Sequence, residues 1–280
     1  MPAAPDRAPS AGAPPSPWRS ARAARRRFWL ALGACALLIA CWGCSRYSAQ
    51  DLHGSDASAV AIADQVMGSL GGKAAWDTLC GLRWSFGSML GDSVRSSRRH
   101  AWDKRTGQHR VDGVNRQGQR YTFIHTLGDT MNGMAWMDGT RIEGDSLHKL
   151  IKRAYALWVN DSYWMLMPYK LRDPGVTLKN AGDTTIAGVA YTRLALTFAN
   201  VGLTPGDRYW VFVNPANHRV ERWEMVLQDD QPPPEAYTWE DWEQHDGLWF
   251  PTAHRRDSTN VFTNKIETVH AFAPTEFLQP

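Results

Sequence analysis

The most constraining feature of this 280-residue chain is a two-residue alternation of apolar and polar side chains that begins at Leu82. Such alternation places every second side chain on one face of an extended strand. The alternating segments are short, and turn-forming residues separate them, including Asp138-Gly139, Asn214-Pro215 and Asp246-Gly247. This pattern predicts an antiparallel meander of about 10–12 strands rather than an array in which strands and helices alternate.

A first helix is expected before the strands, over residues 57–70, where apolar side chains recur at helical spacing. Ser55 and Asp56 precede it as good N-cap residues, and Gly71-Gly72 supplies its C-terminal stop. A short helical turn over residues 74–79 should then lead into the sheet.

A second helical segment, over residues 145–167, has one broad apolar face and ends at Pro168. Because this face must be buried, we expect the helix to lie across the open side of the sheet as a lid. The expected fold class is mainly β (α+β): a strongly curved antiparallel sheet that forms an unclosed half-barrel, with an N-terminal helix and a mid-chain helical lid. The pattern leaves open whether the space beneath the lid is a cavity or a packed core.

The N-terminal region has the parts of an export signal. Arginines 25–27 precede 13 apolar residues, 28–40, a run shorter than the roughly 20 residues needed to span a bilayer. It ends in Leu38-Ile39-Ala40-Cys41, which resembles the lipobox of bacterial lipoproteins, whose cysteine receives a diacylglycerol before cleavage in front of it. We therefore expect a signal peptide over residues 1–40, a tether lipidated at Cys41 over residues 41–56, and one domain over residues 57–280.

Removal of the signal changes the charge of the chain. The full sequence has 31 Lys and Arg against 28 Asp and Glu, whereas residues 41–280 have 25 against 27. The case for a nucleic-acid partner disappears with that basicity. We expect a monomer whose partners are the membrane, through its lipid anchor, and acyl chains or other lipoproteins. Beyond Cys41 only Cys44 and Cys80 remain, so the sequence offers no disulfide scaffold.

The residue after the acceptor cysteine bears on location within the bacterial cell envelope. An aspartate there favours retention at the inner membrane in enteric bacteria, and this chain has Trp42 instead. We therefore expect a lipid-anchored protein on the outer membrane, facing the periplasm. Export by the Sec route or the twin-arginine route stays open.

Four stretches of sequence resemble the LolA/LolB superfamily of lipoprotein carriers and receptors, and within it a group of envelope lipoproteins of unknown function. They are Leu70-Gly71-Gly72-Lys73-Ala74-Ala75-Trp76, then Asn160-Asp161-Ser162-Tyr163-Trp164 with Met167-Pro168-Tyr169-Lys170-Leu171, then Asn200-Val201-Gly202-Leu203-Thr204-Pro205-Gly206-Asp207, and the hairpin from Val211-Phe212-Val213-Asn214-Pro215 to Arg219-Val220-Glu221-Arg222-Trp223. The likeness spans about residues 57–272. It implies an unclosed β-barrel with a helical lid, which in the carriers shelters acyl chains. No gating residue of the carriers aligns with this chain.

Twelve tryptophans remain after residue 40, more than an ordinary core requires. Large rigid rings line apolar ligand pockets well, although tryptophans on neighbouring strands also pack as cross-strand pairs. On the second helix, methionines and aromatic rings suit an irregular lipid chain. The candidate lid and pocket residues are Tyr155, Trp158, Trp164, Met165, Met167, Trp84, Phe86 and Trp136.

An enzymatic alternative rests on Gly144-Asp145-Ser146-Leu147, which matches the nucleophile block of the GDSL esterases. That chemistry needs a serine activated by an oriented histidine, and the nearest late match is His270. The esterase block belongs near the start of an α/β domain, whereas here Asp145 and Ser146 also suit a helix N-cap.

Two charged patterns have simple structural interpretations. Asp241, Glu243 and His245 alternate along one strand, which is typical of a solvent-facing side more than of a metal site. A basic strand pair could face anionic lipid or form a solvated sheet edge, and the second interpretation is favoured; its residues are Arg95, Arg98, Arg99, Lys104 and Arg105. We expect no metal and no cofactor. The leading hypothesis is a non-enzymatic lipoprotein that binds a hydrophobic ligand, and the alternative is a structural or interaction lipoprotein with a filled core.

Overall fold

The computed structural model describes residues 54–199 and 201–280. The predicted signal peptide, the acceptor Cys41, Cys44 and most of the tether lie outside these ranges. Within them, strands dominate and form two antiparallel sheets, neither of which closes. The predicted mainly β, unclosed half-barrel architecture is confirmed, although the described residues contain 14 strands rather than 10–12.

Sheet A has nine strands in the order β12-β13-β14-β1-β2-β3-β4-β5-β6. Their bounds are β1 (Gly81–Leu90), β2 (Ser93–Asp103), β3 (Gln108–Val114), β4 (Arg120–Thr126), β5 (Gly133–Met137), β6 (Thr140–Ile142), β12 (Glu240–His245), β13 (Leu248–Arg256) and β14 (Thr259–Val269). Consecutive strands are joined by hairpins, except that the last strand, β14, pairs with the first, β1. Strand β2 lies between β1 and β3, so the interpretation of the basic strands as a sheet edge is wrong for β2.

Sheet B has five strands in the order β11-β10-β9-β8-β7. Their bounds are β7 (Val176–Ile186), β8 (Val189–Phe198), β9 (Arg208–Val213), β10 (Val220–Val226) and β11 (Glu235–Thr238). The chain passes from sheet B to sheet A at Trp239, which is buried and whose backbone N–H donates to the Glu221 carbonyl at 2.9 Å. The strands on either side of Trp239, β11 and β12, therefore belong to different sheets.

Helix α2 (Ala57–Ser69) is followed by α3 (Gly72–Thr78), as predicted. Asp56 occupies the N-cap position of α2, but its side chain makes no capping bond. Its carboxylate instead accepts from Lys179 Nζ at 2.9 Å and from the Asn180 backbone N–H at 3.1 Å, which ties the start of α2 to β7. At the other end Gly71 has a φ of 111°, and a Cβ there would lie 2.3 Å from the Gly247 carbonyl oxygen; only glycine fits this position.

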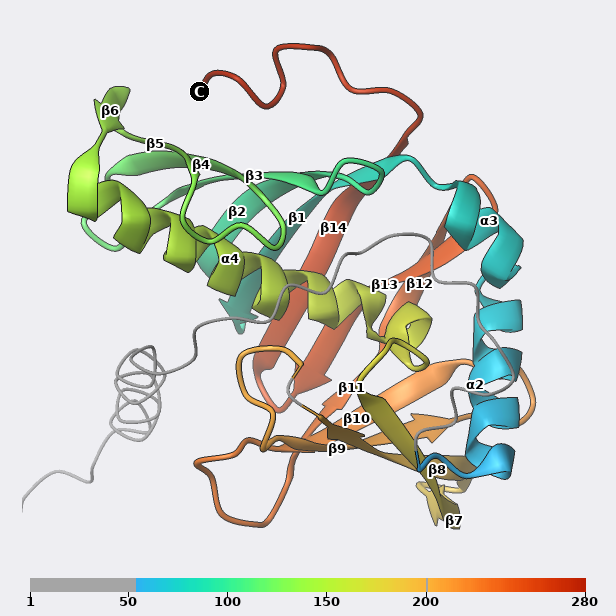
Figure 1. Ribbon diagram of the computed structural model, residues 1–280. Helices are drawn as coiled ribbons and strands as arrows, with labels where there is room; N and C mark the ends of the chain where they lie inside the picture. Colours follow the sequence, from blue (N-terminus) through green and yellow to red (C-terminus); the bar gives the residue numbers. More distant parts are fainter. Residues whose placement is uncertain (1–53, 200) are drawn as a thin grey trace, which may run out of the picture. The chain divides into compact units, whose positions relative to one another are not determined.

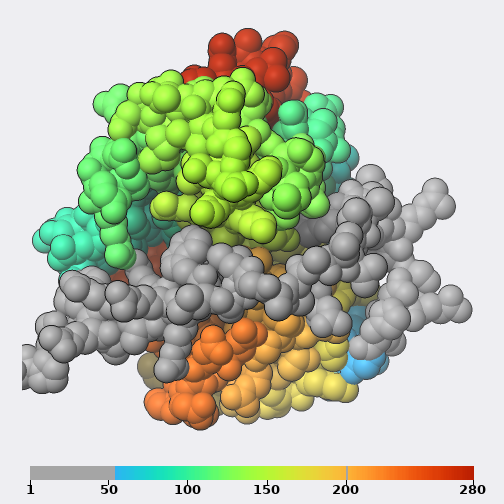
Figure 2. Space-filling model, turned by 60° about the vertical axis from the view of Figure 1, so that its left-hand side comes forward, coloured from blue at the N-terminus to red at the C-terminus, as the bar shows by residue number. Residues whose placement is uncertain are grey.

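Helix α4 (Gly144–Leu166) continues into the 3₁₀ turn η2 (Met167–Lys170), close to the predicted bounds. Its N-cap is Glu143 rather than Asp145 or Ser146. Figure 1 shows α4 running obliquely across one face of sheet A, and it contacts β4, β5 and β13. The exposed start of the helix is yellow-green in Figure 2. None of the helices in the described ranges is both long and apolar enough to cross a membrane.

The C-terminal segment after β14 lies on the face of sheet A opposite α4 (Figure 1). There Arg83 makes two bonds to the Glu276 carboxylate, at 3.0 and 3.1 Å. Phe277 packs with buried Ala101, Ile124 and Trp136. The sheet is therefore covered on one face by a helix and, in part, on the other by the chain terminus.

Candidate functional site

The layer between α4 and the sheets holds seven of the eight predicted ligand residues. Six of them are less than 10% exposed, and Tyr155 is half-buried. Trp158 lies at the centre of the layer, with its ring centroid 4.8 Å from that of Trp102, 5.1 Å from that of His109 and 6.0 Å from that of Trp84. Alternation explains this arrangement, since Leu82, Trp84 and Phe86 of β1 all face α4.

A second aromatic cluster surrounds Trp164 near the end of α4. Its ring centroid lies 4.9 Å from those of Trp223 and Tyr237 in sheet B, and 5.3 Å from that of His254 in β13. Met165 and Met167 follow it and are fully buried in the same core. The end of α4 thus packs against both sheets.

Trp136 is the one predicted ligand residue that the structure separates from the others. It is on β5 next to Ala135, and successive strand residues face opposite sides. Ala135 packs towards α4, whereas Trp136 packs with Ile124 and Phe277 under the C-terminal segment. It therefore does not take part in the layer beneath the helix.

A buried ion pair ties α4 to sheet A. Asp161 of α4 is 0% exposed, and Arg98 of β2 reaches it with two donors, Nε to Oδ2 and Nη2 to Oδ1, the latter at 2.8 Å. Asp161 also accepts a bond from Asn160 Nδ2 at 2.8 Å. Burial alone would raise the pKa of Asp161, but Arg98 and His100 outweigh it and hold the pKa below its ordinary value. Arg98 is therefore a structural partner of α4 rather than a solvated charge.

Three buried histidines extend this pair across sheet A. His100 Nε2 lies 3.0 Å from Asp161 Oδ2, His100 Nδ1 lies 2.9 Å from His109 Nε2, and His109 Nδ1 lies 3.0 Å from His125 Nε2. They come from β2, β3 and β4, with His109 directly opposite His125 in the register. We call Asp161, His100, His109 and His125 the histidine chain.

The far end of the histidine chain is His125 Nδ1, which is buried and has no hydrogen-bond partner among the described residues. Burial lowers the pKa of His100, lowers that of His109 further, and lowers that of His125 to about 4. All three rings are therefore neutral at neutral pH. No role was predicted for these histidines from the sequence. Each one nevertheless lies at an alternate strand position that faces α4, as Arg98, His100 and Trp102 do in β2.

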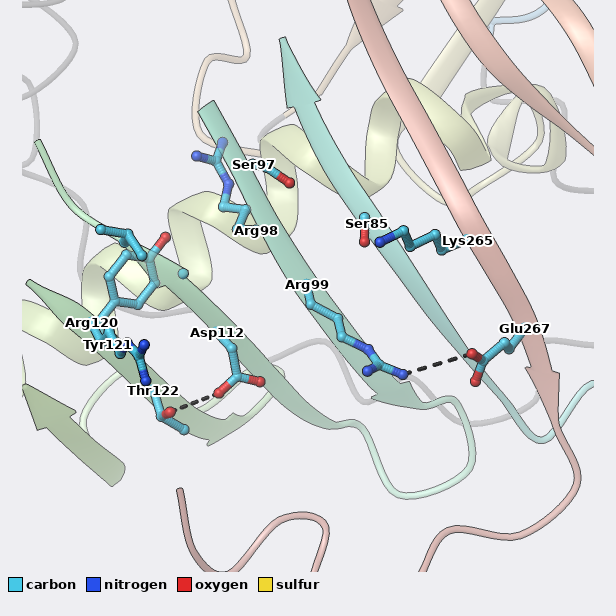
Figure 3. A pocket seen from close by; sticks show the side chains of 12 residues that line it. Ser85, Ser97, Arg98, Arg99, Asp112, Arg120, Tyr121, Thr122, Lys265 and Glu267 are labelled. Carbon is cyan, nitrogen blue, oxygen red and sulfur yellow. Dashed lines mark hydrogen bonds and ion pairs between the residues drawn. The ribbon is translucent and has the colours of Figure 1, made fainter. Parts of the chain in front are cut away.

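A shallow pocket of about 480 Å³ lies over β14 and β1 to β4 of sheet A (Figure 3). In it Arg99 faces Glu267 at 3.7 Å, and Thr122 donates to Asp112 at 2.6 Å. Its lining is mostly polar and charged and includes none of the eight predicted ligand residues. This pocket suits a polar ligand and not an acyl chain.

The structure does not bring the esterase candidates together. Ser146 is exposed at the start of α4, just after β6 at one edge of sheet A. His270 follows β14, the third strand from the other edge, and pairs with Asp246 at 3.1 Å.

The acidic residues of β12 have partners in the structure: Asp241 forms an ion pair with Arg255 at 2.6 Å, and a Glu243 carboxylate oxygen lies 3.2 Å from His245 Nε2. Among residues 54–199 and 201–280, no group of three or more His, Cys, Asp or Glu side chains is placed to hold a metal ion.

Comparison with known proteins gives similarities at the level of structure only. No protein-family model and no curated protein matches the chain. Among solved structures it is similar to a LolA superfamily protein from Nitrosomonas europaea, at 11% identity over 79% of this chain and 97% of that one, with a TM-score of 0.47. A DUF1329 family protein from Desulfovibrio piger has 14% identity over 78% and 96%, with a TM-score of 0.45.

A putative outer membrane lipoprotein-sorting protein domain from Vibrio parahaemolyticus is a third similar structure, at 12% identity over 79% of this chain and 96% of that one, with a TM-score of 0.42. The function proposed below follows from the side chains of this chain.

Proposed function

We propose that this protein is a lipid-anchored protein of the bacterial cell envelope that binds an acyl chain, or the lipid moiety of another lipoprotein, beneath α4 without catalysing a reaction. The observation that carries the proposal is the layer of rings and methionines that α4 buries against both sheets. Flat aromatic faces and flexible thioethers give an acyl chain apolar contact without demanding a fixed shape.

The rings of this layer already touch one another, so an acyl chain enters only when α4 moves away from the sheet. Because neither sheet closes into a barrel, α4 can lift without breaking a strand ladder, but it must break the bonds of Asp161 to Arg98 and His100. The helix therefore serves as the lid. The lipobox motif supports the anchor at Cys41, and Trp42 supports the outer membrane as the place of action.

The same ring contacts favour a second candidate, a structural or interaction lipoprotein with a filled core. In that case the aromatic layer would only stabilise the fold, and partners would bind elsewhere on the surface. The two candidates differ in whether apolar ligands are taken up at all.

Native mass spectrometry of the gently extracted lipoprotein distinguishes them. We expect one adduct with the mass of a fatty acid or phospholipid per protein, and uptake of a fluorescent fatty acid by the delipidated protein. Absence of both the adduct and the uptake would leave the filled-core lipoprotein as the function.

A further inference from the structure

The hydrogen bonds of the histidine chain have only one possible direction at neutral pH. Ionised Asp161 can only accept, so His100 must carry its proton on Nε2, 3.0 Å away. Neutral His100 then accepts at Nδ1 from His109 Nε2–H, and His109 accepts at Nδ1 from His125 Nε2–H. One acceptor is left over, and it is His125 Nδ1, the buried nitrogen without a partner in the described structure.

We propose that the histidine chain is a proton relay that links protonation of His125, near the end of β4, to the packing of α4 on sheet A. A proton from water binds His125 Nδ1, and the Nε2 proton of His125 passes to His109 Nδ1. The Nε2 proton of His109 passes in turn to His100 Nδ1. His100 keeps its own Nε2 proton and becomes an imidazolium against Asp161, so one proton has entered and one positive charge has moved across three strands.

The surroundings of the two ends explain why the charge settles at His100. Imidazolium at His100 lies 3.0 Å from the fully buried Asp161 carboxylate. A charge on His125 is favoured only by the Thr126 backbone and by Asp129, whose carboxylate already accepts bonds from the backbone of Met131 and Asn132 and from the Asn132 side chain. The titratable groups that face the histidine chain are Arg98 on β2, Asp112 on β3, Tyr121 on β4, Tyr155 on α4 and Asp129 in the β4–β5 loop. Arg98 opposes the charge on His100, and Asp161 and Asp112 favour it.

The burial of the histidine chain between α4 and sheet A makes the packing of α4 sensitive to acid. Asp161 belongs to α4 and the three rings belong to the sheet, so the added charge is buried in the contact between them. Burial lowers the pKa of all three histidines, so rings exposed by lifting α4 bind more protons than buried rings. The free energy that keeps α4 packed on sheet A is largest above the unperturbed histidine pKa of about 6.5. It decreases as the pH falls towards the lower pKa values of the buried histidines. The relay depends on the proposed function in one respect only: the acyl chain is the ligand that would enter when α4 lifts from the sheet.

Nitrogen-15 NMR of histidine-labelled protein tests the relay without any ligand. At pH 7 we expect His100, His109 and His125 all to carry the proton on Nε2. As the pH is lowered towards 4, His100 should become doubly protonated while His109 and His125 switch to the Nδ1–H form. Protonation of His125 alone, or no change in any of the three rings before the protein unfolds, would overturn the proposal.

Two variants test whether the proton reaches His100 through His109. His109→Phe interrupts the relay, so a proton on His125 should no longer change His100. His254→Phe is the matched control, since His254 is also a buried histidine facing α4 but lies outside the histidine chain; it should leave the response of His100 unchanged. If His109→Phe does not fold, the tautomers of the unmodified protein still decide the question.

Hydrogen exchange tests the link to α4. The amides of α4 should lose protection by about tenfold per pH unit for one linked proton, and at higher pH than the amides of β1 and β14. Equal loss in helix and strands would show global unfolding and would contradict the acid-sensitive hold. Because neither readout uses a lipid, failure to find an acyl ligand would leave this inference standing.

Discussion

At the scale of single residues, Asp161 is the side chain on which the contact between α4 and sheet A most depends. It is a fully buried carboxylate that accepts from Arg98, His100 and Asn160. Removing one partner of a buried ion pair is costly because the other charge stays buried without compensation.

Asp161→Asn should therefore lower the free energy of unfolding by about 3–5 kcal/mol, measured by urea denaturation at pH 7. Asp64→Asn is the control, because Asp64 is about half exposed in its pair with Arg172 and exposed pairs contribute about 0–1 kcal/mol. Equal losses in the two variants would mean that Asp161 does not hold the helix.

The histidine chain also shows what the sequence can and cannot predict about single residues. Alternate residues of β2, namely Arg98, His100 and Trp102, share one face of the strand. This could be predicted from the sequence, because successive strand residues face opposite sides. The meeting of His100, His109 and His125 depends on the register of three strands, which alternation does not determine. Arg98 was assigned to a solvated edge because its partner, Asp161, lies 63 residues away in the chain.

At the scale of elements, the fit of α4 on sheet A is close at Gly133 of β5. A Cβ on Gly133 would lie 2.5 Å from the Ile124 carbonyl oxygen and 2.5 Å from Ile151 Cδ1 of α4. The first of these is backbone and cannot move aside, so any side chain here forces the helix and the strand apart.

Gly133→Ala should therefore destabilise the protein by about 1–3 kcal/mol. The contrasting variant is Gly68→Ala in α2, where a Cβ would meet nothing within 4 Å and alanine should add about 0.5–1 kcal/mol through helix propensity. Thermal unfolding of both proteins gives the comparison. A neutral Gly133→Ala would show that α4 sits loosely on the sheet.

Most elements were predicted because their boundaries have local chemical causes. Helices α2 and α4 follow from apolar periodicity, and the turns at Asp138-Gly139 and Asp246-Gly247 lie between strands as expected. Strand β7 is not marked by the alternation, because six of its eleven residues are polar and only Leu178 is buried. The change of sheet at Trp239 could not be predicted, because it depends on how the two sheets pack and no glycine or proline marks it in residues 237–244.

At the scale of the whole domain, sheet A separates two environments. The face beneath α4 is aromatic and holds the histidine chain, and the opposite face carries the charged pocket and the C-terminal segment. The sequence predicted a lid over a sheet but could not assign each tryptophan to a face, as Trp136 shows. The signal peptide, the lipid on Cys41 and the tether stay predictions from the sequence.

The central claim, that an acyl chain binds between α4 and sheet A, is tested most directly by quenching of tryptophan fluorescence with a dibrominated fatty acid, since bromine quenches only rings close to it. Trp158 of α4 and Trp136 of β5 are comparably buried, at 6% and 8% exposed, but pack against opposite faces of sheet A. We expect quenching in the unmodified protein, a clearly smaller quenched fraction in Trp158→Phe, and no reduction in Trp136→Phe. Absence of quenching, or a reduction only in Trp136→Phe, would contradict binding beneath α4.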